Sequence, residues 1–389
     1  MKKTYKFFLL IVIVPLLTGC WDRIEIEERG FVVGVGIDLA EKDKEKDSQV
    51  FKTTCQFVVP VGIGGPTIGA GNEKAFMNVS ETGDNMFEIT RKMATKVARS
   101  PFYEHLQVLI LSEEVVRNKE NLPAVLDFFL RDHEMRRAQK LLIARDSAKD
   151  ILDFEPKVEK LPSMYIDSIS ENYYKTAVIM KPARIGDVHE YLLQDNNFVI
   201  PSIRKSEDGV KIDGAAVFRG NNNKLIGFID EQDVASLNFI TGDAKGAEIK
   251  TQYKDNVVMF EVQNAKSKIE PKIHSEDDIE FNIKISTEGN IVLSHTPVDF
   301  LDDKEVDKIE KAIEKALKEE ISKTIKDIQK DLKVDILGLN RILEQKEYET
   351  WKKIKNKWDQ GEGRFPASKI NVKVDTKVRT SGSTGQSLK

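Results

Sequence analysis

The sequence has very little cysteine for its length. Only Cys20 and Cys55 occur among 389 residues. Two cysteines cannot build the disulfide framework of a small secreted protein, so packed apolar cores must provide the stability. Phe51 and Phe57 share one face of a strand-like run with Cys55. We therefore expect Cys55 to be a small buried side chain rather than a reactive thiol.

Histidine is scarce as well, and its five copies are scattered. His133 and His189 are each followed by glutamate, as in a zinc-protease helix, but Arg137 and Leu193 stand four positions after them. A second ligand is missing in both cases, so the sequence predicts no metal site. Surface or polar-core positions are expected for all five, namely His105, His133, His189, His274 and His295.

Catalytic motifs are absent too. The chain has no G-x-S-x-G elbow and no G-K-[ST] phosphate loop, and Gly34 and Gly36 lack a third glycine and a following helix. Carboxylates are mostly interleaved with lysines, which is typical of a solvated face. The densest polar cluster, 131–137, fits a partner surface or, preferably, a salt network at a helix end. The sequence therefore predicts a non-enzymatic protein without a cofactor.

The composition is that of a globular protein with an acidic balance. Hydrophobic residues make up 40% and charged residues 32%, and the formal net charge is -4. Residues 1–19 hold three lysines and no acid, so the rest of the chain is at -7. An acidic body argues against nucleic acid as a partner. Its charge alone would not hold it on an anionic membrane.

The start of the chain has the pattern of a sorting signal. Three lysines precede an apolar run over 7–17, which is shorter than the roughly 20 residues that cross a bilayer and which contains Pro15. Leu17, Thr18 and Gly19 then lead into Cys20, an order that resembles the bacterial lipobox. In a lipobox the cysteine thiol takes a diacylglyceryl group before the signal is cut. The sequence thus predicts a lipid on Cys20.

Such a lipid would place the protein on a membrane surface without spanning it. Each buried methylene contributes about 0.8 kcal/mol, so one acyl chain binds marginally whereas two hold stably. Two alternatives to the lipoprotein signal remain open. One is an ordinary secretory signal with a coincidental cysteine, and the other is an uncleaved N-terminal helix.

Periodicity predicts an α+β fold with mixed and antiparallel sheets covered by helices. Strands are expected at 31–39, 49–59 and 74–79, with a mobile glycine-rich loop at 62–72. Strand 105–111, a helix capped by Asn121 and strand 140–145 suggest a βαβ unit. Thr82 or Asp84 is expected to cap a helix that lies between strand 74–79 and strand 105–111.

The remaining chain predicts two more units. Strands near 198–203, 210–218 and 225–229 with a helix at 234–240 form a small middle unit. A β-meander follows, with a turn at Gly289-Asn290, and then a long amphipathic helix pair and a strand at 370–378. A coiled-coil arm is the less favoured reading of the helices. Expected are a signal peptide 1–19, an N-terminal α+β domain 20–179, a middle α+β domain 180–243, a C-terminal sheet-plus-helices domain 244–378 and a disordered tail 379–389.

Several short stretches, in this order, resemble the Ger(x)C lipoproteins, the C subunits of spore germinant receptors. Each stretch is weak alone, but jointly they are specific and they run through essentially the whole mature chain. They are Cys20-Trp21-Asp22, Gly34-Val35-Gly36-Ile37-Asp38, Glu104-His105-Leu106, Asp127 to Asp132, Gly214-Ala215-Ala216-Val217-Phe218 and Lys224-Leu225-Ile226-Gly227.

The resemblance implies a non-enzymatic subunit anchored on the outer face of the inner spore membrane, where it works with two integral membrane subunits. Cys20 would carry S-diacylglycerol and an N-acyl chain, and no other functional residue carries over. Whether such a subunit contacts the germinant itself is not implied. A solute-binding lipoprotein of an importer is the alternative, although such proteins usually show two similar lobes. A cell-wall hydrolase would need a catalytic pair that the sequence lacks.

Overall fold

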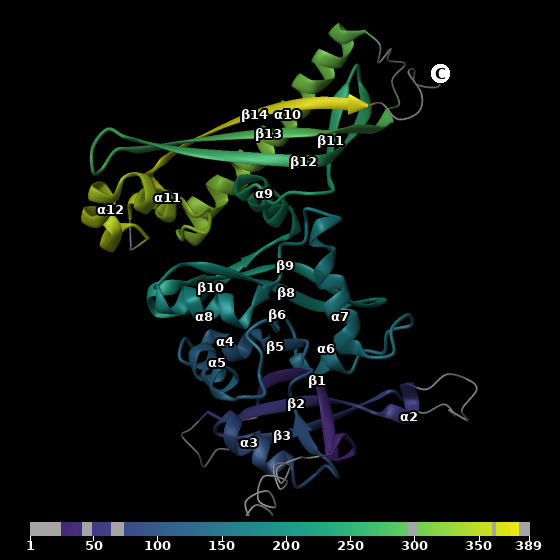
Figure 1. The fold of residues 1–389 in the computed structure, drawn as a ribbon. Helices are drawn as coiled ribbons and strands as arrows, with labels where there is room; N and C mark the ends of the chain where they lie inside the picture. The colour runs from purple at the N-terminus through teal and green to yellow at the C-terminus, as the bar shows by residue number, and fades with distance from the viewer. Residues whose placement is uncertain (1–24, 41–48, 64–73, 295–301, 360–362, 381–389) are drawn as a thin grey trace, which may run out of the picture.

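The protein consists of two β-sheets that lie at opposite ends of an elongated body, each with helices packed on it (Figure 1). This computed structural model describes residues 25–40, 49–63, 74–294, 302–359 and 363–380. The larger sheet has ten strands and the smaller has four. Among the described residues, no helix is long and apolar enough to cross a bilayer.

The larger sheet combines both strand directions. In the order β10-β9-β8-β6-β5-β1-β2-β3, the four central strands are parallel and the outer pairs are antiparallel, with β4 beside β1 and β7 beside β6. The bounds are β1 (Arg29–Leu39), β2 (Phe51–Val58), β3 (Phe76–Gly83), β4 (Ser100–Phe102), β5 (Val108–Ser112), β6 (Lys140–Ala144), β7 (Ala183–Arg184), β8 (Phe198–Ser206), β9 (Gly209–Arg219) and β10 (Lys224–Ile229).

Helices cover both faces of this sheet. Leu109 and Leu111 of β5 enter one apolar cluster and Val108 and Ile110 enter another, because successive strand residues point to opposite faces. The first cluster includes α3, α4, α5 and α8, and the second includes α6 and α7. The helices of this part are α2 (Pro60–Ile63), α3 (Met86–Met93), α4 (Glu113–Arg117), α5 (Asn121–Arg131), α6 (Ala148–Leu152), α7 (Pro162–Ser170), α8 (Ile185–Leu193) and α9 (Glu231–Thr241).

The predicted local pairings of the first strands are confirmed. β2 runs antiparallel to β1, and β6 runs parallel to β5 with α5 between them, as a βαβ unit requires. Every residue of β5 is buried, in keeping with its continuous apolar run.

Strands expected to form a separate middle domain instead extend the larger sheet. β8 pairs in parallel with β6, with Ser202 beside Ile143 and Ile203 beside Ala144. β9 and β10 then continue the same sheet. The structure thus shows a mixed α/β fold with two sheets and does not clearly separate three domains. The predicted domain boundaries stay a prediction.

The smaller sheet is a meander of three strands completed by a parallel fourth. β14 returns beside β13 after the helices, which confirms the predicted final strand. The turn predicted at Gly289-Asn290 is wrong, because β13 continues through both residues, opposite Val262 and Glu261. The elements are β11 (Ala247–Tyr253), β12 (Asn256–Ile273), β13 (Ile279–Ser294), α10 (Asp303–Asp327), α11 (Leu339–Lys346), α12 (Tyr348–Ile354), α13 (Arg364–Ala367) and β14 (Lys369–Thr380).

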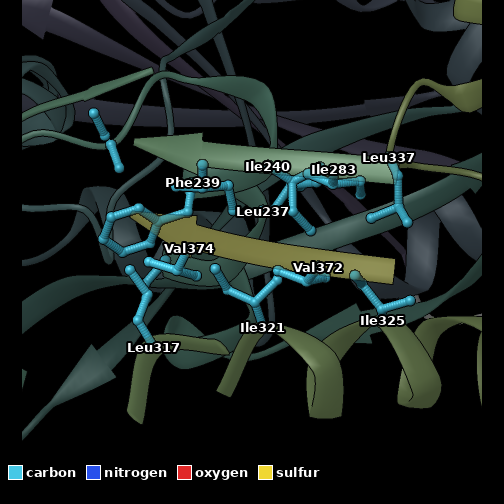
Figure 2. Packing of buried hydrophobic residues seen from close by; sticks show 14 of the residues in the cluster. Leu237, Phe239, Ile240, Ile283, Leu317, Ile321, Ile325, Leu337, Val372 and Val374 are labelled. Atoms are coloured by element: carbon cyan, nitrogen blue, oxygen red, sulfur yellow. The ribbon is translucent and has the colours of Figure 1, made fainter. Parts of the chain in front are cut away.

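One face of the smaller sheet packs on the long helix α10. Figure 2 shows Leu317, Ile321 and Ile325 of α10 lying against Val372 and Val374 of β14. A spacing of four residues places the three helix side chains on one face, as the sequence pattern predicted. The apolar face of α10 is therefore covered by the sheet, so α10 does not form a coiled-coil arm.

Helix α9 joins the two sheets into one body. Leu237 and Ile240 of α9 belong to the same apolar cluster as Ala215 and Val217 of β9 and as the core of the smaller sheet. Figure 1 shows α9 between the two sheets. The sheets therefore share a continuous core.

Two helix caps differ from the sequence prediction. Asn85, rather than Thr82 or Asp84, caps α3, with its side chain accepting from the Glu88 amide. Asn121 lies inside the first turn of α5, where its side chain donates to the Val115 carbonyl at 2.8 Å. The predicted mobile loop, 62–72, and the predicted tail, 379–389, lie mostly outside the described residues. Within the described residues, 62–63 belong to α2 and 379–380 belong to β14, so the predicted tail begins two residues too early.

Candidate functional site

The predicted lipid site, Cys20, lies outside the described residues, together with the rest of 1–24. The described chain passes from Glu25 through a short 3-10 turn, Ile26–Glu28, into β1. The N-terminal segment therefore joins the body at β1, in the larger sheet.

The second cysteine behaves as the sequence predicted. Cys55 is buried in the apolar cluster between β2 and the helices, where its sulfur lies 3.8 Å from the hydroxyl of Tyr103. Burial raises the pKa of the Cys55 thiol to about 12, with the Tyr103 hydrogen bond opposing the shift. The thiol therefore stays protonated and unreactive at neutral pH.

The glycines of the Gly34-Val35-Gly36-Ile37-Asp38 stretch allow helices to approach β1 closely. A Cβ on Gly34 would lie 2.1 Å from the Ser163 hydroxyl of α7, and one on Gly36 would lie 3.1 Å from the backbone of Ala148 in α6. A larger side chain at Gly34 would overlap Ser163, and one at Gly36 would need α6 to shift by a few tenths of an ångström. In the described fold this stretch is a packing surface, consistent with the absence of a phosphate-loop pattern.

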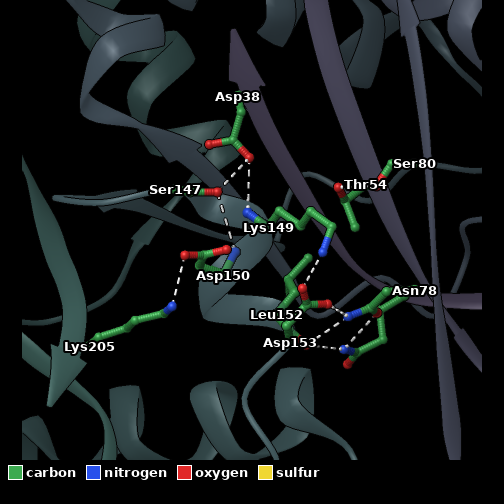
Figure 3. Close-up of polar contacts among 11 residues, drawn as sticks. Asp38, Thr54, Asn78, Ser80, Ser147, Lys149, Asp150, Leu152, Asp153 and Lys205 are labelled. Carbon is green, nitrogen blue, oxygen red and sulfur yellow. Dashed lines mark hydrogen bonds and ion pairs between the residues drawn. The ribbon is translucent and has the colours of Figure 1, made fainter. Parts of the chain in front are cut away.

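Asp38, which ends the same stretch, holds the start of α6. Its carboxylate accepts from the backbone amide of Ala148 at 2.7 Å. It also accepts from the Lys149 amide at 2.9 Å and from the Ser147 hydroxyl at 3.2 Å (Figure 3). Amides at a helix start have no partner within the helix, and a carboxylate there also favours the helix dipole. Asp38 is itself buried, and its carboxylate serves to hold the first turn of α6 against β1.

The other end of α6 is held by the neighbouring strands. The Leu152 carbonyl accepts from the side-chain amides of Gln56 at 3.0 Å and Asn78 at 2.8 Å. Asn78 also donates to Asp153, and Gln56 accepts from the Ser163 amide. Side chains of β1, β2 and β3 thus fix a five-residue helix that is too short to be stable by itself.

The histidines and the cluster at 131–137 do not assemble into a reactive site. Within the part of the chain that the structure describes, no group of three or more His, Cys, Asp or Glu side chains is placed to hold a metal. Arg131 pairs with Asp127 one turn earlier, and Glu134 accepts from the Tyr103 amide at 3.3 Å. Both contacts are intramolecular, but they are one ion pair and one hydrogen bond to a backbone amide rather than the predicted salt network. His295 lies outside the described residues.

A polar junction connects the two sheets on the side of α8 and α11. Asn197, just before β8, donates through its side chain to the Asp335 carbonyl at 3.1 Å and to the Asp359 carboxylate, and it accepts from the Gly220 amide at 3.1 Å. The Asp359 carboxylate also accepts from the Asp335 amide at 3.2 Å. One asparagine of the larger sheet therefore binds two segments of the smaller unit.

Asp335 is almost fully buried, with 2% of its surface exposed. Its carboxylate accepts from the amides of Leu337 and Asn340, at 3.0 and 2.7 Å, and from the Trp358 indole nitrogen at 2.9 Å. Burial raises the pKa of Asp335 although these donors oppose the shift. Burial, and then the charge of Asp335, raise the pKa of Asp359 to about 7. Two adjacent buried carboxylates resist being charged together.

Two cavities flank this junction. One of about 440 Å³ lies between the start of β8, the end of α9 and the segment 335–341. The other, of about 620 Å³, lies between the turn 194–197 and α11 and α12, and both are lined by Asn197 and Asn340. Their size is within the range of small-molecule pockets. Sequence reasoning missed this junction, because its residues come from segments more than a hundred positions apart and none belongs to a known motif.

Comparisons with known proteins agree over the length of the chain. A family model described as the spore germination protein N-terminal domain matches residues 22–205. A second, described as spore germination B3/GerAC like, C-terminal, matches residues 213–382. The two matches follow one another and together span both sheets.

Three relatives in Bacillus subtilis (strain 168) match along nearly all of their length. Spore germination protein YndF is 29% identical and covers 95% of each chain. Spore germination protein B3 is 27% identical over 99% of this chain and 100% of that protein, and spore germination protein A3 is 28% identical over 97% of each.

The crystal structure of the GerBC protein has a similar fold. Its TM-score is 0.61 at 23% identity, and the match covers 88% of this chain and 97% of that one. With both family domains in order and full-length relatives, the chain belongs to the Ger(x)C family of spore germination proteins, the family of germinant-receptor C subunits.

Proposed function

We propose that this protein is the lipid-anchored C subunit of a spore germinant receptor. It acts without catalysis, on the outer face of the inner spore membrane, through contacts with two integral membrane subunits of the same receptor. One observation carries the proposal: the N-terminal family domain begins at residue 22, two positions after Cys20, and the C-terminal domain follows it to residue 382. A lipid on Cys20 would therefore lie directly before the body that the family model matches.

The architecture suits a tethered interaction body. The shared core at α9 and the hydrogen bonds of Asn197 join the two sheets, so a partner bound at either sheet would act on one connected unit. Diacylglycerol and an N-acyl chain on Cys20 would confine that unit to the membrane plane. Partner subunits in the same membrane would then meet it at a high effective concentration.

The alternative, a solute-binding lipoprotein of an importer, fits the architecture less well. Such proteins usually have two similar α/β lobes with the ligand between them. Here one sheet has ten strands in mixed order and the other has four. The cavities beside Asn197 therefore separate two unlike units.

Co-purification from spore membranes distinguishes the two functions. A C-terminally tagged chain, solubilised in mild detergent, should recover two integral membrane proteins in constant ratio. An untagged strain is the control for non-specific recovery. Recovery of a peripheral ATPase with a membrane permease would support the importer and contradict the receptor proposal.

A further inference from the structure

A row of three lysines crosses the open face of the smaller sheet. In the strand register, Lys268 of β12 lies directly beside Lys284 of β13, and Lys284 lies directly beside Lys373 of β14. All three side chains are exposed. Like charges placed directly opposite on neighbouring strands destabilise a sheet, so this arrangement carries a cost in the free protein.

The row lies on the face of the smaller sheet that no helix of the described residues covers. Along β13 and β14, alternate residues are buried against α10 and the core, and the residues between them, including Lys284 and Lys373, point the other way. On this open face, residues that lie side by side on β12, β13 and β14 form rows across the sheet. Four successive rows carry six lysines and three carboxylates, a net charge of +3 in a chain whose net charge is -4. The charged residues of these rows are Lys266, Lys268, Glu270, Lys272, Glu280, Lys284, Lys369, Lys373 and Asp375.

Lys284 and Lys373 of the lysine row lack the ion pairs that other lysines on this face form. Lys369 pairs with Glu280 at 3.7 Å, and Lys268 pairs along its own strand with Glu270 at 2.6 Å. Among the described residues, no carboxylate lies within ion-pair distance of Lys284 or Lys373. Two adjacent ammonium groups therefore remain without a counter-charge on an uncovered surface.

We propose that this lysine row binds an acidic segment of another polypeptide chain. Neighbouring strands are about 4.8 Å apart, so the three Cα positions are spaced at about that interval across the sheet. Carboxylates at positions i, i+3 and i+7 of a helix recur at about 5 Å along its axis, which follows from a rise of about 1.5 Å per residue. An acidic helix lying across the strands can place one carboxylate beside each lysine.

The charge pattern fits a discrete acidic segment better than an anionic bilayer. Glu270 and Asp375 stand in the rows on either side of the lysines, and Glu280 stands one row beyond Glu270, so all three would be pressed against lipid phosphates. The acidic balance of the whole chain would add repulsion from a uniformly negative surface. A polypeptide can place its carboxylates on the lysine row and keep the flanking rows free. This inference rests on the face alone, so it does not depend on the lipid anchor.

The test measures binding of two synthetic helical peptides to the purified mature chain in detergent. One peptide has glutamates at i, i+3 and i+7, and the other has the same composition with the glutamates spread around the helix. The first should bind more tightly, and its affinity should fall as salt is raised from about 0.05 to 0.5 M. The double variant Lys284→Glu/Lys373→Glu should weaken its binding at least tenfold.

A control variant on α10, a melting temperature and lipid vesicles complete the test. Lys315→Glu/Lys318→Glu makes the same charge change on exposed positions of α10 and should leave peptide binding unchanged. The Lys284→Glu/Lys373→Glu protein should keep the wild-type melting temperature or exceed it, because the repulsion between positions 268 and 284 becomes an attraction while positions 284 and 373 remain a like-charge pair. Equal peptide binding by this variant and the wild type would overturn the proposal. So would binding to phosphatidylglycerol vesicles that exceeds peptide binding and is lost in the same variant.

Discussion

Asn197 and Asp359 lie 162 positions apart in the chain, and the side-chain amide of the first donates a hydrogen bond to the carboxylate of the second. The same amide donates to the Asp335 carbonyl, and its own carbonyl accepts from Gly220. Both polar atoms of one side chain are thus engaged where the larger sheet meets the helices of the smaller unit. This junction is polar, whereas the contact through α9 is apolar.

Replacing Asn197 by alanine should weaken the connection between the two sheets. The change leaves the Asp335 carbonyl and the Asp359 carboxylate without this donor in a largely buried setting, so the free energy of unfolding should fall by about 1–3 kcal/mol. Urea unfolding measures the loss. Asn196→Ala is the control, because among the described residues its side chain bonds only Gln194, at the surface, and its effect should stay within about 0.5 kcal/mol. Equal effects of the two variants would contradict the assigned role of Asn197.

Asp359 should make the stability of the protein depend on pH. Its pKa of about 7 in the folded chain lies above the ordinary value of 3.8, because it is buried beside Asp335. Between about pH 4 and pH 7 the unfolded carboxyl has lost its proton while the folded one keeps it. The native state binds more protons in this window, so this group's contribution to stability is lost as pH rises, by on the order of a few kcal/mol in total.

Asp359→Asn isolates that contribution. The amide keeps the shape of the side chain but cannot be charged, so the variant should gain stability relative to the wild type between pH 5 and pH 8. Paired denaturant titrations at these two pH values give the difference directly. A difference that does not change with pH would show that Asp359 is ionised in the folded protein throughout this range.

Gly34→Ala should destabilise the packing of α7 on β1. The added methyl group would lie 2.1 Å from the Ser163 hydroxyl, which is itself bonded to Gln56. Overpacking of this kind costs about 1–3 kcal/mol. Gly227→Ala is the matched control, since its nearest neighbour is the flexible end of Leu332 at 3.4 Å. Thermal unfolding of both variants checks the prediction, and an unchanged melting temperature for Gly34→Ala would contradict it.

Cys55 should resist alkylation in the folded protein. Its thiol is buried and its pKa is raised to about 12, so almost none of it is the reactive thiolate at pH 8. Iodoacetamide labelling followed by mass spectrometry should find Cys55 unmodified under native conditions and fully modified in denaturant. Rapid native labelling would show that the strand carrying Cys55 opens readily.

Local sequence patterns predicted most elements but not their assembly. The apolar alternation of 198–229 identified β8, β9 and β10 correctly, yet it could not show that Ser202 would pair with Ile143 of β6. Pairing between distant strands leaves no local signal, so a compact local unit was the natural expectation. The junction at Asn197 was missed for the same reason, since a single asparagine carries no information about a partner 162 positions away.

Gly289 shows how a correct local rule can give a wrong element. Gly-Asn between apolar runs is a strong hairpin signal, and the sequence predicted a turn there. In the structure a Cβ on Gly289 would lie 2.0 Å from the Glu261 carbonyl of β12. The glycine is therefore needed because the neighbouring backbone comes close, within a strand that continues.

Membrane fractionation of spores carrying Cys20→Ala tests the central proposal most directly. Cys55→Ala is the control, because it removes the other cysteine and leaves the lipobox intact. A lipid-anchored receptor subunit predicts that Cys20→Ala protein leaves the spore membrane fraction and that nutrient-triggered germination is impaired, while Cys55→Ala protein stays in the membrane fraction. Retention of the Cys20→Ala protein in the membrane, at the wild-type level, would contradict the anchor.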